Sequence, residues 1–248
     1  MLAVILVGGK GTRLSALHPG IPKALVPVAG RPFLQWQLEW LLGAGVRRAH
    51  LSCGHMAGQI IDWAAGNPVA GMELSCAEEP FPLGTAGGLL FAARVATGDP
   101  FFALNGDSLL PRLRFESMVL ALERGAAEAA MAVTSIQAAD RYGTVEIGKD
   151  GRITAFREKT RCDSGWINAG VYLLKRSVLA AIPENRAAWL ETDVFPALAQ
   201  AGRLMAFRES PPLLDMGTPG GIAAMSEYLA EFGAPRGGRR DRPGKGEE

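Results

Sequence analysis

The chain has 248 residues, and its 26 lysines and arginines nearly balance its 25 aspartates and glutamates. This balance gives no electrostatic reason to expect a nucleic acid as partner. The three cysteines lack metal-ligand spacing and favour a reducing compartment over a disulfide-stabilised fold. No apolar run approaches the roughly 20 residues of a membrane-spanning helix, and no signal peptide is recognised at Met1. We therefore expect a soluble cytoplasmic protein that does not contact membranes.

The first half of the chain alternates short apolar runs with segments of helical spacing. Strands are expected at residues 2–7, 48–53, 72–77, 101–104 and 129–136. Helices are expected at residues 32–42, 56–65, 84–95 and 116–124. This alternation is typical of an α/β fold, in which crossover helices join the strands of a parallel sheet.

The second half begins differently. Residues 144–147 and 153–156 flank Lys149-Asp150-Gly151, which predicts a β-hairpin. An apolar strand is expected at residues 167–174, and helical spacing returns at residues 177–181, 193–201 and 220–232. We predict a single domain over residues 1–232. Residues 233–248 are rich in glycine, proline and charge, which predicts a disordered tail.

A glycine-rich loop, Gly8-Gly9-Lys10-Gly11-Thr12-Arg13, follows the first apolar run, and Lys23 comes shortly after it. Glycines allow the backbone to approach a ligand and to turn its N–H groups toward an anion. Arg13 and Lys23 add positive charge, so the loop is suited to a polyphosphate. It matches neither the P-loop nor the dinucleotide fingerprint. The alternative is an ordinary turn with two solvated cations.

The segment Leu6-Val-Gly-Gly-Lys-Gly-Thr-Arg-Leu14, followed by Pro22-Lys23 and Leu25-Val-Pro-Val28, resembles the signature of the sugar-1-phosphate nucleotidyltransferases. The family's usual proline and threonine between the arginine and the lysine are replaced by Ala16-Leu-His-Pro-Gly20. The resemblance extends to about residue 230. It implies a Rossmann-like three-layer sandwich with a mostly parallel, mixed central sheet of the nucleotide-diphospho-sugar transferase type. It also implies a nucleotide-binding half at about residues 1–110 and a sugar-binding half at about 111–232.

Two aspartates are predicted to bind Mg²⁺. Asp107 ends the segment Leu104-Asn-Gly-Asp107 directly after an apolar strand, where α/β proteins bind ligands. Asp215 lies in Leu214-Asp-Met-Gly-Thr-Pro219, which resembles the family's second metal motif. Carboxylates are suitable Mg²⁺ ligands, and the resemblance gives both residues this role. The alternatives are a turn-forming residue for Asp107 and a helix N-cap for Asp215.

The segment from Glu79 to Gly88 resembles the family's nucleobase loop, with Gly84 and Thr85 in its best-matching part. A carboxylate only accepts hydrogen bonds. Guanine offers two adjacent donors, N1–H and the 2-amino group, whereas uracil and thymine offer one donor between two acceptors. Glu79 therefore favours GTP, because a pyrimidine would leave acceptors facing acceptors. The alternative is that Glu79 is a surface charge of the loop.

The resemblance assigns the sugar 1-phosphate to residues in the second half. Gly143 would let the sugar ring lie against the backbone, Glu158 and Asn168 would bind sugar hydroxyls, and Lys159 would hold the phosphate. Thr160 replaces the proline that often follows this lysine in the family. Alternatively, Glu158 and Lys159 form a surface ion pair of little consequence.

The resemblance implies that a sugar 1-phosphate attacks the α-phosphorus of a nucleoside triphosphate and pyrophosphate leaves. Arg13, Lys23 and Asp107 are the expected catalytic residues. The expected nucleotide-binding residues are Leu6, Gly8, Gly9, Gly11, Thr12, Arg13, Lys23, Glu79, Gly84 and Thr85. We expect a monomer or homodimer.

Within the family, the chain most resembles guanylyltransferases that act on D-glycero-D-manno-heptose 1-phosphate. The alternatives are a mannose 1-phosphate guanylyltransferase, and a uridylyl- or thymidylyltransferase acting on a hexose or N-acetylmuramate 1-phosphate. A non-catalytic regulatory relative that binds nucleotide-sugar is a further alternative. Loss of Arg13, Lys23 or either aspartate would mark it, and all four residues are present.

Overall fold

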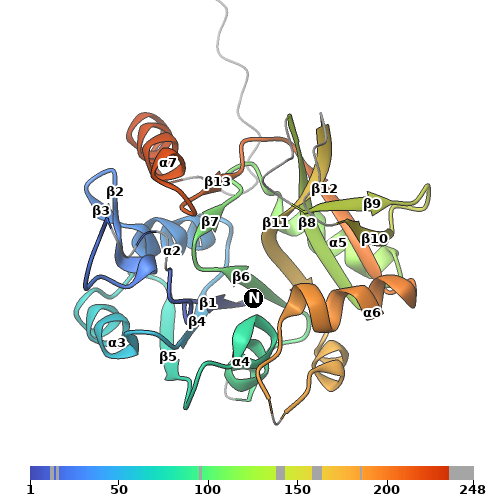
Figure 1. Cartoon of the computed structure of the whole chain (residues 1–248), viewed down its shortest axis with the longest axis horizontal. Helices are drawn as coiled ribbons and strands as arrows, with labels where there is room; N and C mark the ends of the chain where they lie inside the picture. Colours follow the sequence, from blue (N-terminus) through green and yellow to red (C-terminus); the bar gives the residue numbers. More distant parts are fainter. Residues whose placement is uncertain are drawn as a thin grey trace, which may run out of the picture.

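The computed structural model describes residues 1–11, 14, 17–94, 97–137, 143–157, 164–184 and 186–234. A nine-stranded mixed sheet forms the centre of the molecule (Figure 1). Seven strands follow the order β10-β9-β11-β6-β1-β4-β5, while β8 pairs with both β11 and β12. The strands are β1 (Leu2–Leu6), β4 (Arg48–Cys53), β5 (Glu73–Glu78), β6 (Phe101–Asn105), β8 (Ala129–Gln137), β9 (Thr144–Ile147), β10 (Ile153–Arg157), β11 (Ser164–Leu174) and β12 (Leu204–Glu209).

The four strands β6, β1, β4 and β5 are mutually parallel, so their carboxyl ends meet at one edge of the sheet. Strand β1 lies in the middle and is buried on both faces. Ala3 and Ile5 belong to the core on one face, and Leu2 and Val4 to the core on the other. This double burial explains why the first run is apolar at every position.

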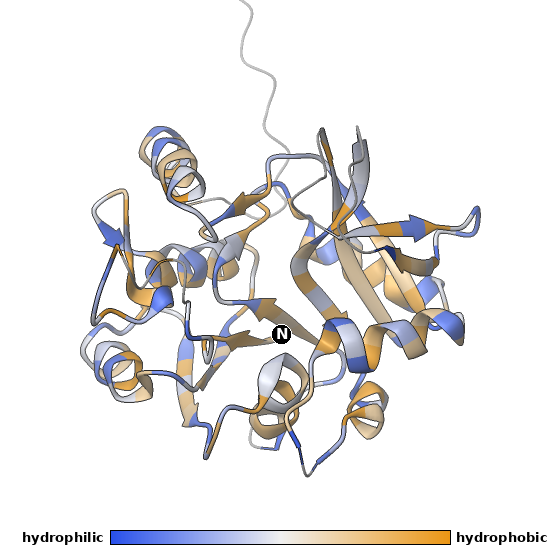
Figure 2. Ribbon diagram, viewed as in Figure 1, coloured by the Kyte–Doolittle hydropathy of each residue, from blue (hydrophilic) through white to orange (hydrophobic). Residues whose placement is uncertain are grey.

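Helices cover both faces of the sheet, which confirms the predicted three-layer α/β fold. Figure 2 shows apolar colouring on the central strands β1 and β6 between these layers. Residues of α2 (Phe33–Gly43), α3 (Ala57–Gly66), α5 (Phe115–Arg124) and α7 (Pro219–Phe232) join the core around Ala3 and Ile5. Residues of α4 (Gly84–Ala93) and α6 (Phe195–Gln200) join the opposite core around Leu2 and Val4.

Several elements differ from the sequence-based expectation. The expected helix at 177–181 is a 3₁₀ helix, η3 (Arg176–Ala181), and the one at 193–201 combines a π turn, η4 (Leu190–Val194), with α6. Strand β12 was not predicted, since its residues alternate poorly between buried and exposed. Strands β9 and β10 form the predicted antiparallel hairpin.

Two short strand pairs were also missed, because two-residue strands leave no periodic pattern. They are β2 (Pro27–Val28) with β3 (Arg31–Pro32), and β7 (Ser108–Leu109) with β13 (Leu214–Asp215). The predicted disordered tail lies outside the described residues from residue 235 onward. None of the helices in the described part of the chain is long and apolar enough to cross a membrane.

Candidate active site

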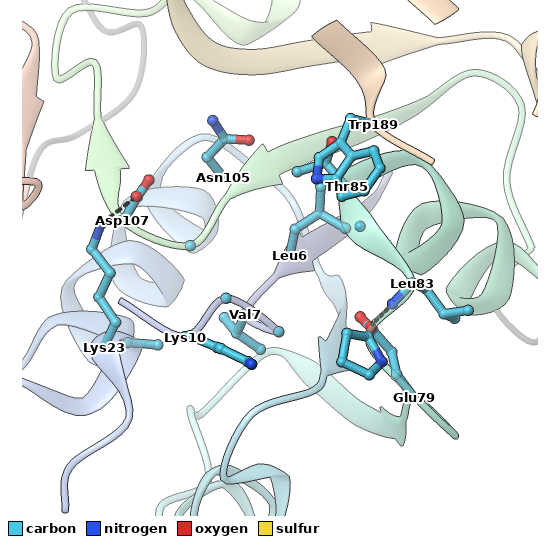
Figure 3. Close-up of a pocket in the computed structure, with 16 residues that line it drawn as sticks. Leu6, Val7, Lys10, Lys23, Glu79, Leu83, Thr85, Asn105, Asp107 and Trp189 are labelled. Atoms are coloured by element: carbon cyan, nitrogen blue, oxygen red, sulfur yellow. Dashed lines mark hydrogen bonds and ion pairs between the residues drawn. The ribbon is translucent and has the colours of Figure 1, made fainter. Parts of the chain in front are cut away.

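The carboxyl ends of the parallel strands open into a cavity of about 460 Å³ (Figure 3). It is lined by Leu6, Val7, Gly8, Gly9, Lys10, Lys23, Ala24, Glu79, Pro82, Leu83, Gly84, Thr85, Asn105, Gly106, Asp107 and Trp189. Eight of the predicted site residues are among them: Leu6, Gly8, Gly9, Lys23, Glu79, Gly84, Thr85 and Asp107. Segments that lie far apart in sequence therefore meet around one space.

The structure gives two different reasons for the presence of glycine in the first loop. A Cβ on Gly8 would lie 2.8 Å from Oε1 of Glu79, and Gly11 has a φ of +56° with its Cβ position 3.1 Å from Cβ of Lys23. Contacts within the protein therefore require glycine at both positions. Nothing lies within 4 Å of a Cβ placed on Gly9, which lines the cavity. Gly9 thus leaves space that a ligand can use.

A lysine and an aspartate form an ion pair at one end of the cavity. Lys23 begins the 3₁₀ helix η1 (Lys23–Leu25), and its Nζ lies 2.5 Å from Oδ2 of Asp107. Their side chains are 18% and 34% exposed, respectively. The lysine ammonium can bind a phosphate, and the neighbouring carboxylate can bind the cation that accompanies this phosphate.

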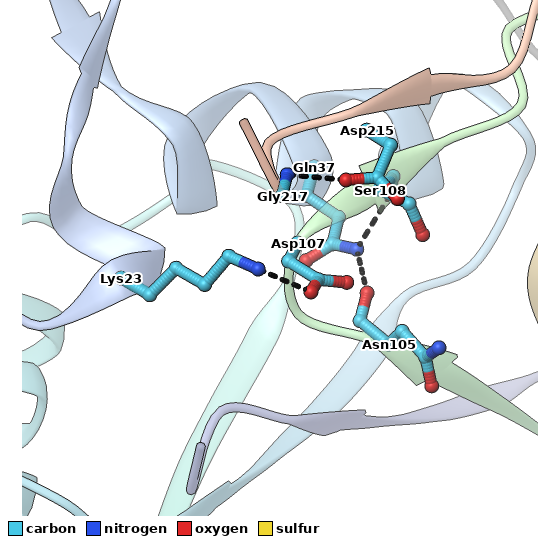
Figure 4. Close-up of polar contacts among 7 residues, drawn as sticks. All are labelled: Lys23, Gln37, Asn105, Asp107, Ser108, Asp215 and Gly217. Carbon is cyan, nitrogen blue, oxygen red and sulfur yellow. Dashed lines mark hydrogen bonds and ion pairs between the residues drawn. The ribbon is translucent and has the colours of Figure 1, made fainter. Parts of the chain in front are cut away.

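The turn that carries Asp107 is held from several sides (Figure 4). The buried Gln37 of α2 donates from Nε2 to the carbonyl oxygen of Asn105 at 2.8 Å and to that of Ser108 at 3.3 Å. The backbone N–H of Met216 donates to the carbonyl oxygen of Asp107 at 3.0 Å. These bonds fix the turn without using the carboxylate of Asp107.

The pairing of β7 with β13 brings the second predicted metal ligand to the first. Asp215 is the register partner of Ser108, the residue after Asp107. The Oδ1 of Asp215 accepts a hydrogen bond from the backbone N–H of Gly217. The N-cap alternative for Asp215 is wrong, because Thr218 caps α7 by accepting from the backbone N–H of Gly221.

The two aspartates provide a donor set that fits Mg²⁺. Within the described ranges, no three His, Cys, Asp or Glu side chains gather into a metal-binding group. Asp107 and Asp215 are two carboxylates that the β7–β13 pairing brings to neighbouring positions. Mg²⁺ commonly binds one or two carboxylates and completes its coordination with phosphate oxygens and water. The set suits a metal that is bound together with a phosphorylated substrate.

Glu79 lies on another side of the cavity from the Lys23–Asp107 pair (Figure 3). Its backbone N–H donates to the carbonyl oxygen of Cys53 at 2.7 Å. Its Oε1 accepts from Oγ of Ser52 at 3.0 Å, and its Oε2 accepts from the backbone N–H of Leu83 at 3.2 Å. Glu79 is therefore a fixed part of the cavity wall, which argues against a free surface charge.

The hydroxyl of Thr85 belongs to a network that leads to the predicted sugar side. Thr85 donates to Oε2 of Glu191 at 3.0 Å and accepts from the backbone N–H of Leu190 at 2.8 Å. On the other side of the carboxylate, the hydroxyl of Tyr172 donates to Oε1 of Glu191 at 3.4 Å. Nδ2 of Asn168 donates to this tyrosine hydroxyl at 2.8 Å.

This network joins α4 to β11. Complete burial, and next the negative charge of Glu191, raise the pKa of Tyr172, so its hydroxyl stays protonated and remains a donor. Asn168 and Gly143 do not line the cavity. The Oδ1 of Asn168 accepts from the backbone N–H of Gly170 at 2.9 Å. Gly143 is exposed directly before β9, and a Cβ there would lie 3.0 Å from the carbonyl oxygen of Arg157.

Four predicted site residues, Thr12, Arg13, Glu158 and Lys159, lie outside the described residues. Sequence reasoning missed other residues of the site. Trp189 lines the cavity while 49% exposed, and Gln37, Ser52 and Glu191 support its walls. A glutamine between apolar positions of a helix is a usable signal for Gln37. No sequence pattern marks the other three.

A model of the nucleotidyl transferase family matches residues 2–231. The chain belongs to the nucleotidyl transferase family. The catalytic subunit beta of mannose-1-phosphate guanylyltransferase from Xenopus tropicalis is 36% identical over 235 residues, which cover 92% of this chain. The chain spans 65% of the length of that relative. A mannose-1-phosphate guanylyltransferase from Mycobacterium tuberculosis is 30% identical over 98% of this chain and 68% of its own length.

Solved structures are similar to this chain over almost its whole length. HddC from Yersinia pseudotuberculosis superposes with a TM-score of 0.82 and 28% sequence identity, covering 92% of this chain and 99% of its own. A second structure of HddC, complexed with GMP-PN, superposes equally well at 29% identity. The nucleotidyl transferase family and the α/β fold predicted from the sequence are thus confirmed.

Proposed function

We propose that this nucleotidyl transferase moves a guanylyl group from GTP to a sugar 1-phosphate and releases pyrophosphate. The observation that carries the proposal is the cavity between two chemically different ends, with Glu79 at one and the Lys23–Asp107 pair at the other. The first suits the two adjacent donors of guanine, and the second suits a polyphosphate. The guanylyltransferase relatives and the GMP-PN complex of HddC support guanine as the base.

The reaction needs charge neutralisation and positioning more than proton transfer. The attacking oxygen belongs to a phosphate that is already anionic, so no general base is required. Lys23 would lie beside the transferred phosphoryl group, Arg13 would bind the triphosphate and the leaving pyrophosphate, and Lys159 would hold the incoming phosphate. Holding two polyanions together in line is the main contribution of these cations.

Asp107 and Asp215 are proposed to hold Mg²⁺ together with substrate phosphates. When bound, the metal neutralises negative charge on the reacting phosphates. The ion pair with Lys23 keeps the Asp107 carboxylate at the cavity, and the β7–β13 pairing keeps Asp215 close to it. Asn105 and Ser108 are anchored by Gln37, so the Asp107 carboxylate is presented from a fixed turn.

For the acceptor, we propose a sugar 1-phosphate of manno configuration. The similarity to mannose-1-phosphate guanylyltransferases supports mannose 1-phosphate. The resemblance in the sequence supports D-glycero-D-manno-heptose 1-phosphate. In this proposal residues 1–232 act as one domain, with the nucleotide in the first half. Gly143, Glu158 and Asn168 then serve the sugar in the second half.

The test is pyrophosphate release with Mg²⁺, measured for GTP, UTP, dTTP, CTP and ATP with a panel of sugar 1-phosphates. The panel contains heptose, mannose, glucose and N-acetylhexosamine 1-phosphates. Turnover confined to GTP and a manno-configured sugar is the expected result. Turnover with UTP or dTTP would contradict guanylyl transfer. No turnover with any pair, in folded protein, would favour a non-catalytic relative that binds nucleotide-sugar.

A further inference from the structure

Ser52 is a fully buried serine on β4, directly behind the cavity wall that carries Glu79. Its Oγ lies 3.0 Å from Oε1 of Glu79 and 3.0 Å from the carbonyl oxygen of Gly88. The hydroxyl has one hydrogen for two acceptors. An ionised carboxylate is the stronger acceptor, so the hydrogen goes to Glu79. The serine therefore contacts a predicted base-reading group without lining the cavity itself.

The carboxylate of Glu79 is confined on three further sides. A Cβ on Gly8 would lie 2.8 Å from its Oε1, and a Cβ on Gly88 would lie 2.7 Å from the same atom. The backbone N–H of Leu83 holds the other oxygen at 3.2 Å. We call Ser52, Gly8, Gly88 and Leu83 the Glu79 cradle. Its two glycines admit the carboxylate, and its two donors bind one oxygen each.

This arrangement leaves the carboxylate suited to a base with two donors. A carboxylate has about four lone-pair positions, two on each oxygen. Among the described residues, Ser52 donates to one position on Oε1 and Leu83 to one on Oε2. With these two donors alone, one position remains on each oxygen. A pair of free positions, one per oxygen, matches the N1–H and 2-amino donors of guanine.

We propose that Ser52 is a positioning residue that orients Glu79 for two-donor recognition of guanine and thereby sets the preference for GTP. The inference deepens the proposed function and rests on its assignment of the base. Inosine triphosphate is the matched probe, because hypoxanthine keeps N1–H and lacks the 2-amino group. A carboxylate held in the correct orientation distinguishes the two bases, and one free to rotate distinguishes them poorly.

The experiment measures the Kd values of GTP, ITP and UTP by calorimetry for the whole chain without a sugar 1-phosphate. Wild type is expected to bind GTP at least about tenfold tighter than ITP, the effect of roughly one hydrogen bond to a charged group. Ser52→Ala is expected to reduce this GTP:ITP ratio about fivefold, mainly by weakening GTP. Ser75→Ala is the control, since it removes a hydroxyl bonded to His50 on the neighbouring strand, away from the cavity.

Ser52→Cys leaves no cavity, because sulfur is larger than oxygen, and it replaces the hydroxyl by a weak donor. It tests the idea if the alanine variant unfolds. The same fall in the GTP:ITP ratio is expected for it. An equal loss of GTP and ITP affinity, or an unchanged ratio, would show a merely structural serine and overturn the inference. Equal affinity of wild type for GTP and UTP would instead overturn the base assignment in the proposed function. Binding is measured without catalysis, so failure of guanylyl transfer is a separate result.

Discussion

Replacing Asp107 by asparagine separates its chemical role from its structural one. The substitution keeps the shape of the side chain and removes its negative charge. Lys23 loses its partner at 2.5 Å. The turn keeps its backbone anchors, because Gln37 bonds to the carbonyl oxygens of Asn105 and Ser108, and Met216 bonds to that of residue 107. The fold should therefore survive the change.

The two expected magnitudes differ enough to be distinguished. The side chains of Lys23 and Asp107 are 18% and 34% exposed, so the ion pair is only partly shielded from water. Its loss should lower the free energy of unfolding by about 1 kcal/mol, which corresponds to a fall in Tm of roughly 2–4 °C. Loss of a charge that acts on the reacting phosphates should reduce kcat roughly 10²- to 10³-fold.

Thermal unfolding and Mg²⁺-dependent pyrophosphate release from GTP would be measured on the same preparations. Glu39→Gln is the matched control, because it breaks the ion pair between Arg31 and Glu39. These two side chains are 34% and 30% exposed, respectively. Neither residue lines the cavity. The control should lose similar stability and keep its activity.

The reasoning would be refuted if Asp107→Asn kept wild-type kcat, whatever its Tm. It would also be refuted if both variants lost activity in proportion to their loss of stability. Asp107 would then be a turn residue whose carboxylate only balances Lys23, the alternative that the sequence left open.

Three further predictions concern residues around the cavity and its supporting sheet. Gly84 has a φ of +74°, and a Cβ there would overlap the carbonyl oxygen of Ala188. Gly84→Ala should therefore lower the free energy of unfolding by about 2–4 kcal/mol in a denaturant titration. A variant with the wild-type unfolding midpoint would contradict this. Tyr172→Phe removes the hydroxyl that accepts a hydrogen bond from Asn168. It should raise KM for the sugar 1-phosphate roughly threefold to tenfold and leave KM for GTP unchanged. Equal changes in both KM values would count against a role of Tyr172 on the sugar side. Burial lowers the pKa of His50; the unfolded chain then binds more protons below about pH 6.5, so the free energy of unfolding should fall as the pH drops from 7.5 to 5.5. This fall should be smaller in His50→Gln, and an identical pH dependence would refute it.

Much of the fold follows from patterns that are local in the sequence. The run from Leu2 to Leu6 is apolar at every position because both faces of β1 are buried, and this signal is readable without a structure. Strand β13 has two residues and β12 lacks clear alternation, so neither leaves such a signal. Pairing of β7 with β13 nevertheless decides that Asp215 comes to the turn of Asp107.

The site residues that the sequence did not predict were missed for a similar physical reason. The motifs identified Glu79 and Thr85, and the structure places both on the cavity wall. Their supporting partners, Ser52 and Glu191, are 27 and 106 residues away in sequence and contact them only through the tertiary fold. An isolated serine in a strand or a glutamate in a π turn carries no local mark of such a contact. The roles of all the predicted site residues, the use of Mg²⁺ and the cytoplasmic location stay predictions.

The most direct measurement of the central claim is pyrophosphate release from GTP with Mg²⁺, with and without mannose 1-phosphate or D-glycero-D-manno-heptose 1-phosphate. The product would be identified by mass spectrometry. The account predicts release that depends on one of these sugar phosphates and yields the corresponding GDP-sugar in equal amount. Release from GTP that is independent of any sugar phosphate, or no GDP-sugar from folded protein, would contradict it.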